Sequence, residues 1–246
     1  MTGLVCASYN IHRCIGRDRR HDPDRIVRVL RELDADVVGL QEVAARAGSE
    51  GDVDQLVHLA TAAGYESVPG PTRHHARGHL ANGLLCRGRV VHTKRVDISI
   101  RGREPRGLLD VDIEHAGSPL RVLVTHFGLS GLDRLFQARR LLEVLGDDRQ
   151  QATLVLGDIN EWFPGPALRR LNARLGRAPS VATFPSGRPI LALDRIWVQP
   201  FAALVEVRAH ATPLARSASD HLPVRAIVEW PATSTARLTH ESGSSI

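Results

Sequence analysis

Short apolar runs alternate with amphipathic segments along most of the chain. Residues 4–11 form an apolar run typical of a buried strand. Asp22 and Pro23 supply a helix start, and the apolar residues that follow, up to Leu33, recur at helical spacing. A longer amphipathic pattern predicts a helix over 132–145. The same patterns predict helices over 55–63 and 166–175, and strands over 36–43, 65–68, 80–86, 90–98, 108–113, 120–125, 153–156, 191–198, 204–209 and 223–228.

The order of these elements indicates the fold class. Helices alternate with strands near both ends of the chain, and strands follow one another in the middle. This order favours an α/β sandwich in which two mixed sheets pack face to face beneath outer helices. No repeat or linker interrupts residues 1–230, which are predicted to form one domain. Residues 231–246 are rich in Ser and Thr, lack a packing period and are predicted to be a disordered tail.

Composition narrows the class of protein. The chain has 246 residues, of which 43% are hydrophobic and 24% charged, as in ordinary globular proteins. No apolar run approaches the roughly 18 residues that a membrane span needs. A basic segment followed by a long apolar one is missing at the N-terminus, so no signal peptide is predicted and a cytoplasmic location is expected. The cysteines, Cys6, Cys14 and Cys86, form no metal or disulfide motif.

The charge of the chain permits anionic partners. The formal net charge is +5, and every basic residue except Lys94 is an arginine, which binds phosphate in a bidentate manner. The chain has 3 Trp, 2 Tyr and 5 Phe, too few for the stacking surface of a single-strand-binding module. Nothing in the sequence requires an obligate protein partner.

Polar residues recur where the predicted apolar strands end. They are Asn10, Glu42, His126, Asp158 and Asn160, and the set is completed by Asp194 within LDRIWV and by the triplet Ser219, Asp220 and His221. Strand ends gathered at one sheet edge form a rigid frame, so these side chains are expected to share a cleft.

This set of side chains favours metal-assisted hydrolysis, because no Ser or Cys nucleophile stands beside a base. Mg²⁺ prefers one or two carboxylates and retains water, which suits Glu42 together with Asp220 or Asn10. A histidine held by a carboxylate can act as a base near neutral pH, which suits His221 beside Asp194.

Seven stretches carry a family resemblance. They are SYNIH, VVGLQEV, ANGLLCR, VTHFGL, LVLGDINEW, LDRIWV and SDHLPV, between Leu4 and Val228. In this order they resemble the endonuclease/exonuclease/phosphatase superfamily, in particular a bacterial branch of unassigned substrate. The resemblance implies a DNase I-like four-layer α/β sandwich and a phosphoesterase that uses Mg²⁺ or Mn²⁺.

The resemblance also implies a role for each matching residue. It places Asn10, Glu42 and Asp220 at the metal, with Asp220 assisting either the metal or His221. It places His126 and Asn160 on the substrate phosphate, gives Asp158 the task of orienting or activating the nucleophile, and lets Asp194 support His221. Whether His221 acts as a base or as an electrostatic clamp stays open.

The expected reaction is hydrolysis of a phosphodiester by direct attack of activated water. The substrate stays open between nucleic acid, a phospholipid headgroup and a soluble phosphate ester, and a phospholipid-headgroup or inositol-phosphate phosphatase is an alternative. A non-catalytic phosphate-binding module is disfavoured, because the metal carboxylate and the GD-x-N pair are both present.

Four further features also have simpler explanations. Arg106 in RGREPRG is a candidate contact for substrate phosphate, although exposed arginines near glycines usually face solvent. The arginine-rich stretch after Gly16 either meets an anionic substrate or solvates a loop. Cys14 and Arg20 match the C-x5-R pattern of cysteine-dependent phosphatases, but the charged, proline-terminated stretch between strand and helix argues against that mechanism. Asn82 is expected to serve a turn.

Overall fold

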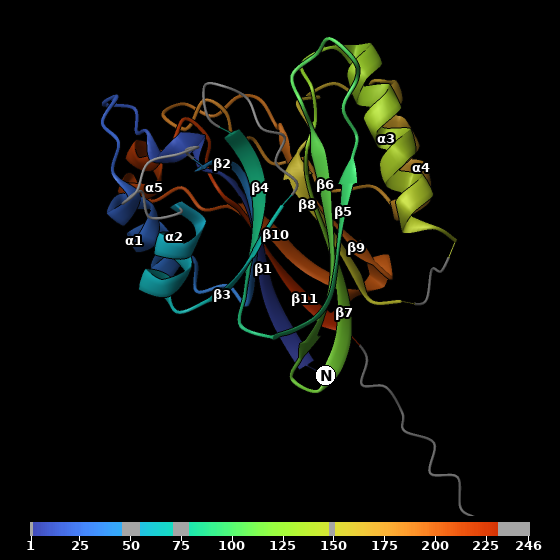
Figure 1. Cartoon of the computed structure of the whole chain (residues 1–246), viewed down its shortest axis with the longest axis horizontal. Helices are drawn as coiled ribbons and strands as arrows, with labels where there is room; N and C mark the ends of the chain where they lie inside the picture. The colour runs from blue at the N-terminus through green and yellow to red at the C-terminus, as the bar shows by residue number, and fades with distance from the viewer. Residues whose placement is uncertain (1, 46–54, 71–78, 148–150, 231–246) are drawn as a thin grey trace, which may run out of the picture.

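Two mixed β-sheets form the centre of the molecule (Figure 1). The computed structural model describes residues 2–45, 55–70, 79–147 and 151–230; the predicted tail 231–246 lies outside these ranges. The strands are β1 (Thr2–Asn10), β2 (Val37–Ala45), β3 (Glu66–Pro69), β4 (His79–Cys86), β5 (Arg89–Asp97), β6 (Gly107–His115), β7 (Ser118–His126), β8 (Thr153–Asp158), β9 (Asp194–Gln199), β10 (Leu204–Ala209) and β11 (Val224–Trp230).

Each sheet contains one parallel pair of strands among antiparallel ones. The six-stranded sheet has the order β10-β11-β1-β2-β4-β3, with β1 and β2 parallel. The five-stranded sheet has the order β5-β6-β7-β8-β9, with β7 and β8 parallel. In both sheets the parallel pair lies near the middle. The four strands of these pairs, β1, β2, β7 and β8, end at the same edge of the molecule. The predicted α/β sandwich is confirmed.

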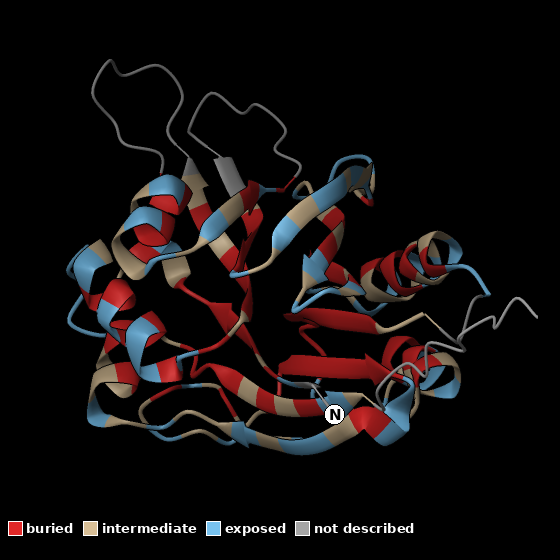
Figure 2. Cartoon of the chain, turned by 90° about the horizontal axis from the view of Figure 1, so that it is seen from below, coloured by how far each residue is buried: buried red, intermediate tan, exposed pale blue. Residues whose placement is uncertain are grey.

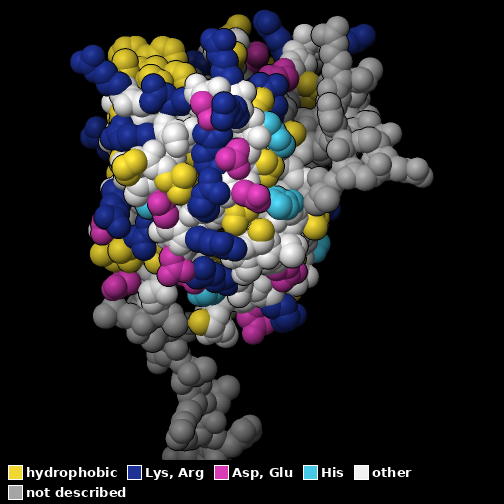
Figure 3. All heavy atoms as spheres, turned by 90° about the vertical axis from the view of Figure 1, so that its left-hand side faces the viewer, with side chains coloured by type: hydrophobic (Ala, Val, Ile, Leu, Met, Phe, Trp, Pro, Cys, Tyr) yellow, Lys and Arg dark blue, Asp and Glu magenta, His cyan; other side chains and the backbone are white. Residues whose placement is uncertain are grey.

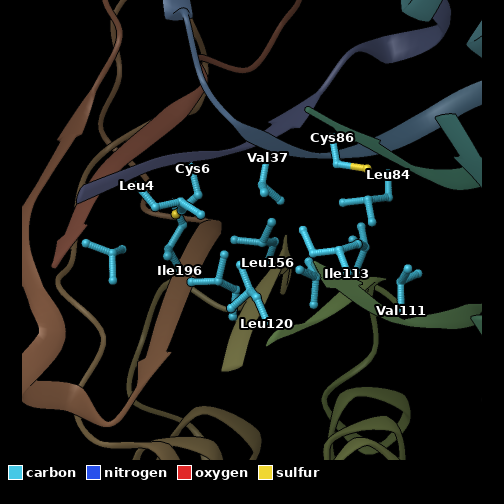
Figure 4. Packing of buried hydrophobic residues seen from close by; sticks show 14 of the residues in the cluster. Leu4, Cys6, Val37, Leu84, Cys86, Val111, Ile113, Leu120, Leu156 and Ile196 are labelled. Atoms are coloured by element: carbon cyan, nitrogen blue, oxygen red, sulfur yellow. The ribbon is translucent and has the colours of Figure 1, made fainter. Parts of the chain in front are cut away.

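The two sheets pack face to face through aliphatic side chains. Leu4, Cys6 and Val37 project from one sheet towards Leu156 and Ile196 of the other (Figure 4). All of these residues are buried, as expected from their position on alternate sites of strands that are covered on both faces. The apolar runs in the sequence therefore became the inner layers of the sandwich.

Glycine at position 39 allows the sheets to approach each other closely. A Cβ atom built on Gly39 of β2 would lie 2.9 Å from Leu156 Cβ and 3.1 Å from Val124 Cγ1 of the opposite sheet. A side chain at this position would therefore force neighbouring core residues apart. Asn82 also joins the sheets, because its amide donates to the Gly107 carbonyl oxygen at 2.8 Å. The expectation that Asn82 serves a turn was wrong, since it lies within β4.

We expect Gly39→Ala to lower the free energy of unfolding by about 1–3 kcal/mol, because the added methyl group overpacks the interface between the sheets. Gly3→Ala is the matched control, because a Cβ at Gly3 of β1 would have no heavy atom within 4 Å. Urea unfolding followed by circular dichroism measures both variants. Equal stabilities for the two variants would show that the close approach at Gly39 is not required.

Helices cover the outer faces of both sheets. They are α1 (Pro23–Leu33), α2 (Gln55–Ala63), α3 (Gly131–Leu145), α4 (Pro166–Leu175) and α5 (Pro213–Ala218), with the short turns η1 (His12–Cys14) and η2 (Phe201–Ala203). Figure 1 shows α1, α2 and α5 beside the first sheet and α3 and α4 beside the second. The buried stripes of these helices face the sheets and their exposed stripes face outward (Figure 2).

The helix start at Asp22 and Pro23 is confirmed by its capping geometry. The Asp22 carboxylate accepts a hydrogen bond from the Arg25 backbone N–H at 2.8 Å, and Pro23 occupies the first turn. Helix α5 was not predicted, because PLARSA is too short for a helical period to emerge. Strand β9 begins at Asp194 instead of residue 191, since Leu191 makes only an isolated bridge to Phe184.

Candidate active site

Polar side chains from both sheets meet at the edge where the parallel strands end. Asn10 is the last residue of β1, and His126 and Asp158 are the last residues of β7 and β8. His126 pairs with Asp158 across the parallel ladder, and Asp158 pairs with Asp194, the first residue of β9. Strand register alone thus places three of the predicted residues side by side.

Glu42 reaches this edge through an irregularity in β2. The pairing of β2 with β4 shifts register between Leu40 and Val43, and Glu42 has a φ of 54°. A bulge of this kind turns a side chain away from the regular alternation of the strand. A positive φ is costly for a residue with a Cβ, and such conformations concentrate at functional sites. Asn160, with a φ of 53°, is a second example at the same site.

Asn10 links two carboxylates across the sandwich. Its Nδ2 donates to Glu42 Oε1 and to Asp158 Oδ2, each at 3.1 Å. The side chain of Asn10 is itself fixed, because its Oδ1 accepts from the His12 backbone N–H at 3.1 Å. One amide therefore holds a carboxylate from each sheet in place.

His221 is held by Asp194 in a buried ion pair. The His221 Nδ1 lies 2.9 Å from Asp194 Oδ2, which also accepts from the Thr183 hydroxyl at 2.5 Å. The ring of Phe184 packs on the imidazole with centroids 4.8 Å apart. This support leaves His221 Nε2 directed towards Asp158 Oδ2, at 3.8 Å. Thr183 and Phe184 were not predicted from the sequence, because a Thr or Phe in a loop carries no distinctive signal.

His126 is held in a neutral form by Asn160. The Asn160 Nδ2 lies 3.1 Å from His126 Nε2 and also donates to the Phe127 carbonyl oxygen at 2.9 Å. An amide nitrogen can only donate, so His126 Nε2 acts as the acceptor. Both N–H groups of Asn160 are thus engaged within the protein, and a phosphoryl oxygen bound by Asn160 would replace one of these bonds.

The surroundings of His126 and His221 shift the pKa values of the two imidazoles in opposite directions. Burial lowers the pKa of His126 to about 3, and the positive charge of Arg106 adds to the effect. Burial also opposes the charged form of His221, but the carboxylates of Asp194, Asp158 and Asp220 outweigh it and raise the pKa to about 10. Without a metal the site therefore holds one neutral and one cationic histidine. Paired groups with pKa values pushed apart are typical of acid–base sites.

We expect the His221 ion pair to make the metal-free protein less stable as the pH rises from 7 to 10. The folded pKa of His221 lies above its unfolded value of 6.5, so the stabilisation is complete below 6.5 and is lost as the pH approaches 10. Denaturant unfolding in EDTA should show a pH-dependent loss on the order of a few kcal/mol relative to His221→Gln. Parallel pH profiles for the two proteins would contradict the raised pKa.

The donor chemistry of the site fits a divalent cation. Asp158, Asp194 and His221 offer ligand atoms within 4.8 Å of one another. Asp194 Oδ1 is buried and has no hydrogen-bond partner among the residues that the structure describes. This buried group differs from the predicted ligand set of Asn10, Glu42 and Asp220, in which Asn10 is buried and the two carboxylates are partly exposed. The carboxylate oxygens in both sets, and the amide oxygen of Asn10 in the predicted set, suit Mg²⁺ or Mn²⁺.

Asp220 lies at the mouth of the site. Its Oδ1 accepts from the Ser219 hydroxyl at 3.3 Å and lies 3.7 Å from His12 Nδ1. His12 was not predicted as a site residue; it arrives there through the left-handed turn η1, in which its φ is 43°. Ser219 also donates to the Asn10 carbonyl oxygen at 2.8 Å, which ties the triplet to the end of β1.

The side chain of Arg106 is largely buried. Its Nη2 donates to Glu104 Oε2 at 2.8 Å, while its Nε is buried with no hydrogen-bond partner in the described part of the chain. Arg106 directly precedes β6, whose Leu108 pairs with Thr125 beside His126, so it lies next to the site. The simple explanation of a solvent-facing loop arginine does not hold, since only 8% of this side chain is exposed.

The arginine-rich stretch after Gly16 belongs to the surface. Arg17, Arg19 and Arg20 are exposed, and Arg17 lies against Gly187 near the Asp220 side of the site. The side of the molecule with α1, α2 and α5 shows basic side chains spread among acidic ones (Figure 3).

Cys14 is fully buried, and burial raises the pKa of its thiol to about 12. A thiol in this state is a poor nucleophile, in agreement with the rejected cysteine-phosphatase pattern.

The fold and the convergence of carboxylates, amides and imidazoles define the class of DNase I-like α/β sandwiches. Within that class the chain belongs to the Endonuclease/Exonuclease/phosphatase family, whose sequence profile matches residues 7–221. It is 30% identical over 216 residues to the uncharacterized protein YbhP of Escherichia coli K12, covering 80% of this chain and 84% of YbhP. Members of this family are generally phosphoesterases or nucleases.

Solved structures share the fold. The endonuclease/exonuclease/phosphatase of Beutenbergia cavernae aligns with a TM-score of 0.76 and 24% identity, over 93% of this chain and 72% of that chain. The human Nocturnin catalytic domain with bound sulfate aligns with a TM-score of 0.72 and 17% identity, over 93% and 94%. A Bacteroides thetaiotaomicron mannosyl-6-phosphatase gives 0.71 and 18%, over 92% and 99%. At these identities the similarity concerns the fold.

Proposed function

We propose that this protein is a divalent-metal-dependent phosphoesterase that hydrolyses phosphodiester bonds by direct attack of activated water. The observation that carries the proposal is the position of Asp158. Its carboxylate lies 3.6 Å from His126 Nε2 and 3.8 Å from His221 Nε2, and it accepts from Asn10, which also binds Glu42. Family membership supports the same reaction class.

Each residue of the site has a chemical task in this proposal. Asp158 orients the attacking water and accepts its proton, because it is the carboxylate that contacts the other groups. His221, kept protonated by Asp194, donates towards a phosphoryl oxygen and stabilises the charge that develops there. His126 and Asn160 bind the scissile phosphate, and the unpartnered Nε of Arg106 supplies a further donor.

A divalent cation would be held by Glu42 with Asn10 and Asp220. When bound, it would polarise the phosphoryl group and lower the pKa of bound water. Asn10 then has a positioning role, because it fixes Glu42 relative to Asp158. No covalent intermediate is needed, and the thiol of Cys14, the nucleophile of the cysteine-phosphatase pattern, is buried and protonated.

Hydrolysis of bis(p-nitrophenyl) phosphate with Mg²⁺ or Mn²⁺, compared with EDTA, tests the proposal. We expect activity with either metal, loss of activity in EDTA, and normal activity in Cys14→Ser. A panel of DNA, RNA, lysophospholipids and inositol phosphates then distinguishes substrate classes, and p-nitrophenyl phosphate measures monoester preference. Inactivity on the whole panel, together with no metal binding by calorimetry, would contradict the proposal and favour a non-catalytic binding module.

A further inference from the structure

Large apolar side chains are exposed beside the site, on the two segments that follow β7 and β8. We name Leu129, Leu132, Phe136, Trp162 and Phe163 the apolar rim. Leu129 is 77% exposed, Leu132 79% and Phe163 69%. Exposed groups of this size are costly in water when they cluster, and clusters of this kind mark interaction sites. None of these side chains takes part in the chemistry proposed above.

The apolar rim is brought together by the same strand pairing that builds the site. The two segments leave β7 and β8 directly beyond His126 and Asp158, which are paired neighbours. Helices α3 and α4, which continue the segments, lie side by side on the outer face of the second sheet (Figure 1). The rings of Trp162 and Phe163 are 5.9 Å apart, and Leu132 and Phe136 share one face of α3 at a spacing of four residues.

A buried ion pair holds the two segments in a fixed arrangement. Arg134 donates to Glu161 Oε2 at 2.8 Å and to the Leu129 carbonyl oxygen at 2.6 Å, so it joins one segment to the other. Glu161 Oε1 also accepts from the Leu168 backbone N–H at 3.2 Å, at the start of α4. The apolar rim is therefore presented by a rigid support, which lowers the entropic cost of binding.

Exposed arginines lie around the apolar rim, and the exposed carboxylate of Glu104, next to Arg103 in the chain, is paired with Arg106. Asp133 and Glu161 are the carboxylates of the segments 127–136 and 159–169, and both are buried. Exposed arginines flank the rim, because Arg103 lies 3.9 Å from Asp133 and Arg169 donates to the Pro164 carbonyl oxygen at 2.6 Å. Exposed Leu, Phe and Trp side chains bordered by arginine are typical of surfaces that bind anionic lipid bilayers.

We propose that the apolar rim docks on the surface of an anionic lipid bilayer and places the site against phosphoesters at that surface. What the site does there rests on the proposed function. A lipid surface explains the rim better than single-stranded nucleic acid, because the aliphatic Leu129 and Leu132 cannot stack on bases. It also explains the rim better than a second copy of the chain, because a two-fold contact would bring the flanking arginines of both copies together.

Co-sedimentation of the full chain with lipid vesicles, in EDTA and without turnover, tests the docking. We expect binding to phosphatidylglycerol/phosphatidylcholine vesicles, weaker binding to pure phosphatidylcholine, and weakening by salt. Leu132→Ser/Phe163→Ser should reduce the partition coefficient at least about tenfold, because two apolar side chains no longer enter the bilayer. Val205→Ser/Phe201→Ser is the matched control, since these exposed side chains lie at the opposite end of the sheets.

Tryptophan fluorescence gives a second readout that does not depend on the stability of the variant. Trp162 is exposed, Trp197 is buried, and Trp230 is half-buried at the opposite end of the sheets, where it pairs with Thr2. Vesicles should therefore shift the emission of the wild type to shorter wavelength and leave that of Trp162→Phe nearly unchanged. A protein that binds vesicles but hydrolyses no phosphoester would contradict the proposed function and still support the docking proposal. A protein that hydrolyses phosphoesters but binds no vesicles would contradict the docking proposal and still support the proposed function.

Three other results would overturn the docking proposal. The first is vesicle binding by Leu132→Ser/Phe163→Ser equal to that of the wild type. The second is binding of an oligodeoxythymidylate that this variant loses while vesicles stay unbound, which would indicate nucleic acid. The third is a concentration-dependent dimer in sedimentation velocity that the same variant abolishes, which would indicate a second copy of the chain.

Discussion

Replacing His221 with alanine is expected to lower kcat for a phosphodiester by roughly 10²–10⁴-fold, the range typical of losing a positioned acid–base group or charge donor. The imidazole is buried, cationic in the metal-free protein and directed at Asp158, so solvent cannot replace it. The measurement is steady-state hydrolysis of bis(p-nitrophenyl) phosphate at saturating metal.

His58→Ala is the matched control for this variant. His58 also pairs with an aspartate, with its Nε2 2.9 Å from Asp24 Oδ1, but this pair lies on the outer helices α1 and α2. We therefore expect His58→Ala to leave kcat unchanged, which would show that losing a histidine–aspartate pair outside the site does not affect turnover. Asp194→Asn should give an intermediate loss, of about 10–100-fold, because it disturbs the orientation of His221 without removing the ring. Normal kcat in His221→Ala would place the chemistry elsewhere.

Glu42→Ala is expected to abolish metal-dependent turnover, with a loss of about 10³-fold or more, because a metal ligand contributes several kcal/mol of charge stabilisation. The variant also removes the Glu42 carboxylate that accepts a hydrogen bond from Asn10, whose amide also donates to Asp158. Calorimetric titration with Mn²⁺ should show weaker binding, and the metal concentration for half-maximal activity should rise. Glu206→Ala is the control, since Glu206 is an exposed strand residue that pairs with Arg208.

Unchanged Mn²⁺ affinity in Glu42→Ala would direct attention to the buried Asp158, Asp194 and His221 group. The two ligand sets predict different outcomes for a third variant. Asp220→Asn should weaken metal binding if Asn10, Glu42 and Asp220 hold the cation. It should leave metal binding intact if the buried group does, because Asp220 is not among the three groups whose ligand atoms lie together.

Much of the fold follows from local pattern, and the exceptions have physical causes. The cap formed by Asp22 and Pro23 is a local interaction, so the sequence located the start of α1. Helix α5 has 6 residues, fewer than two turns, and is stabilised by packing, so no helical period revealed it. Asn82 was expected in a turn because Asn is common there. Its hydrogen bond to Gly107 forms only when the two sheets stack, so the sequence alone could not reveal it.

In the candidate site, too, some features follow from the local sequence and others depend on the tertiary structure. The sequence identified Asn10 and Asp158 because polar residues at strand ends are a local signal, and His221 because it belongs to the Ser219, Asp220 and His221 triplet. The bulge that turns Glu42 inward, and the use of both Asn160 N–H groups to hold His126, depend on neighbouring strands. The burial of Arg106 likewise could not be read from RGREPRG, because a stretch of arginines and glycines has the same appearance in solvent and in a cleft.

The sequence by itself determined the succession of strands and helices, the α/β sandwich, the family and the residue types available for chemistry, because these rest on local propensity, periodicity and motif order. The tertiary structure decided which groups touch, which histidine carries a charge, and where apolar side chains remain exposed. Those properties depend on strand register and on the dielectric surroundings that distant segments create together.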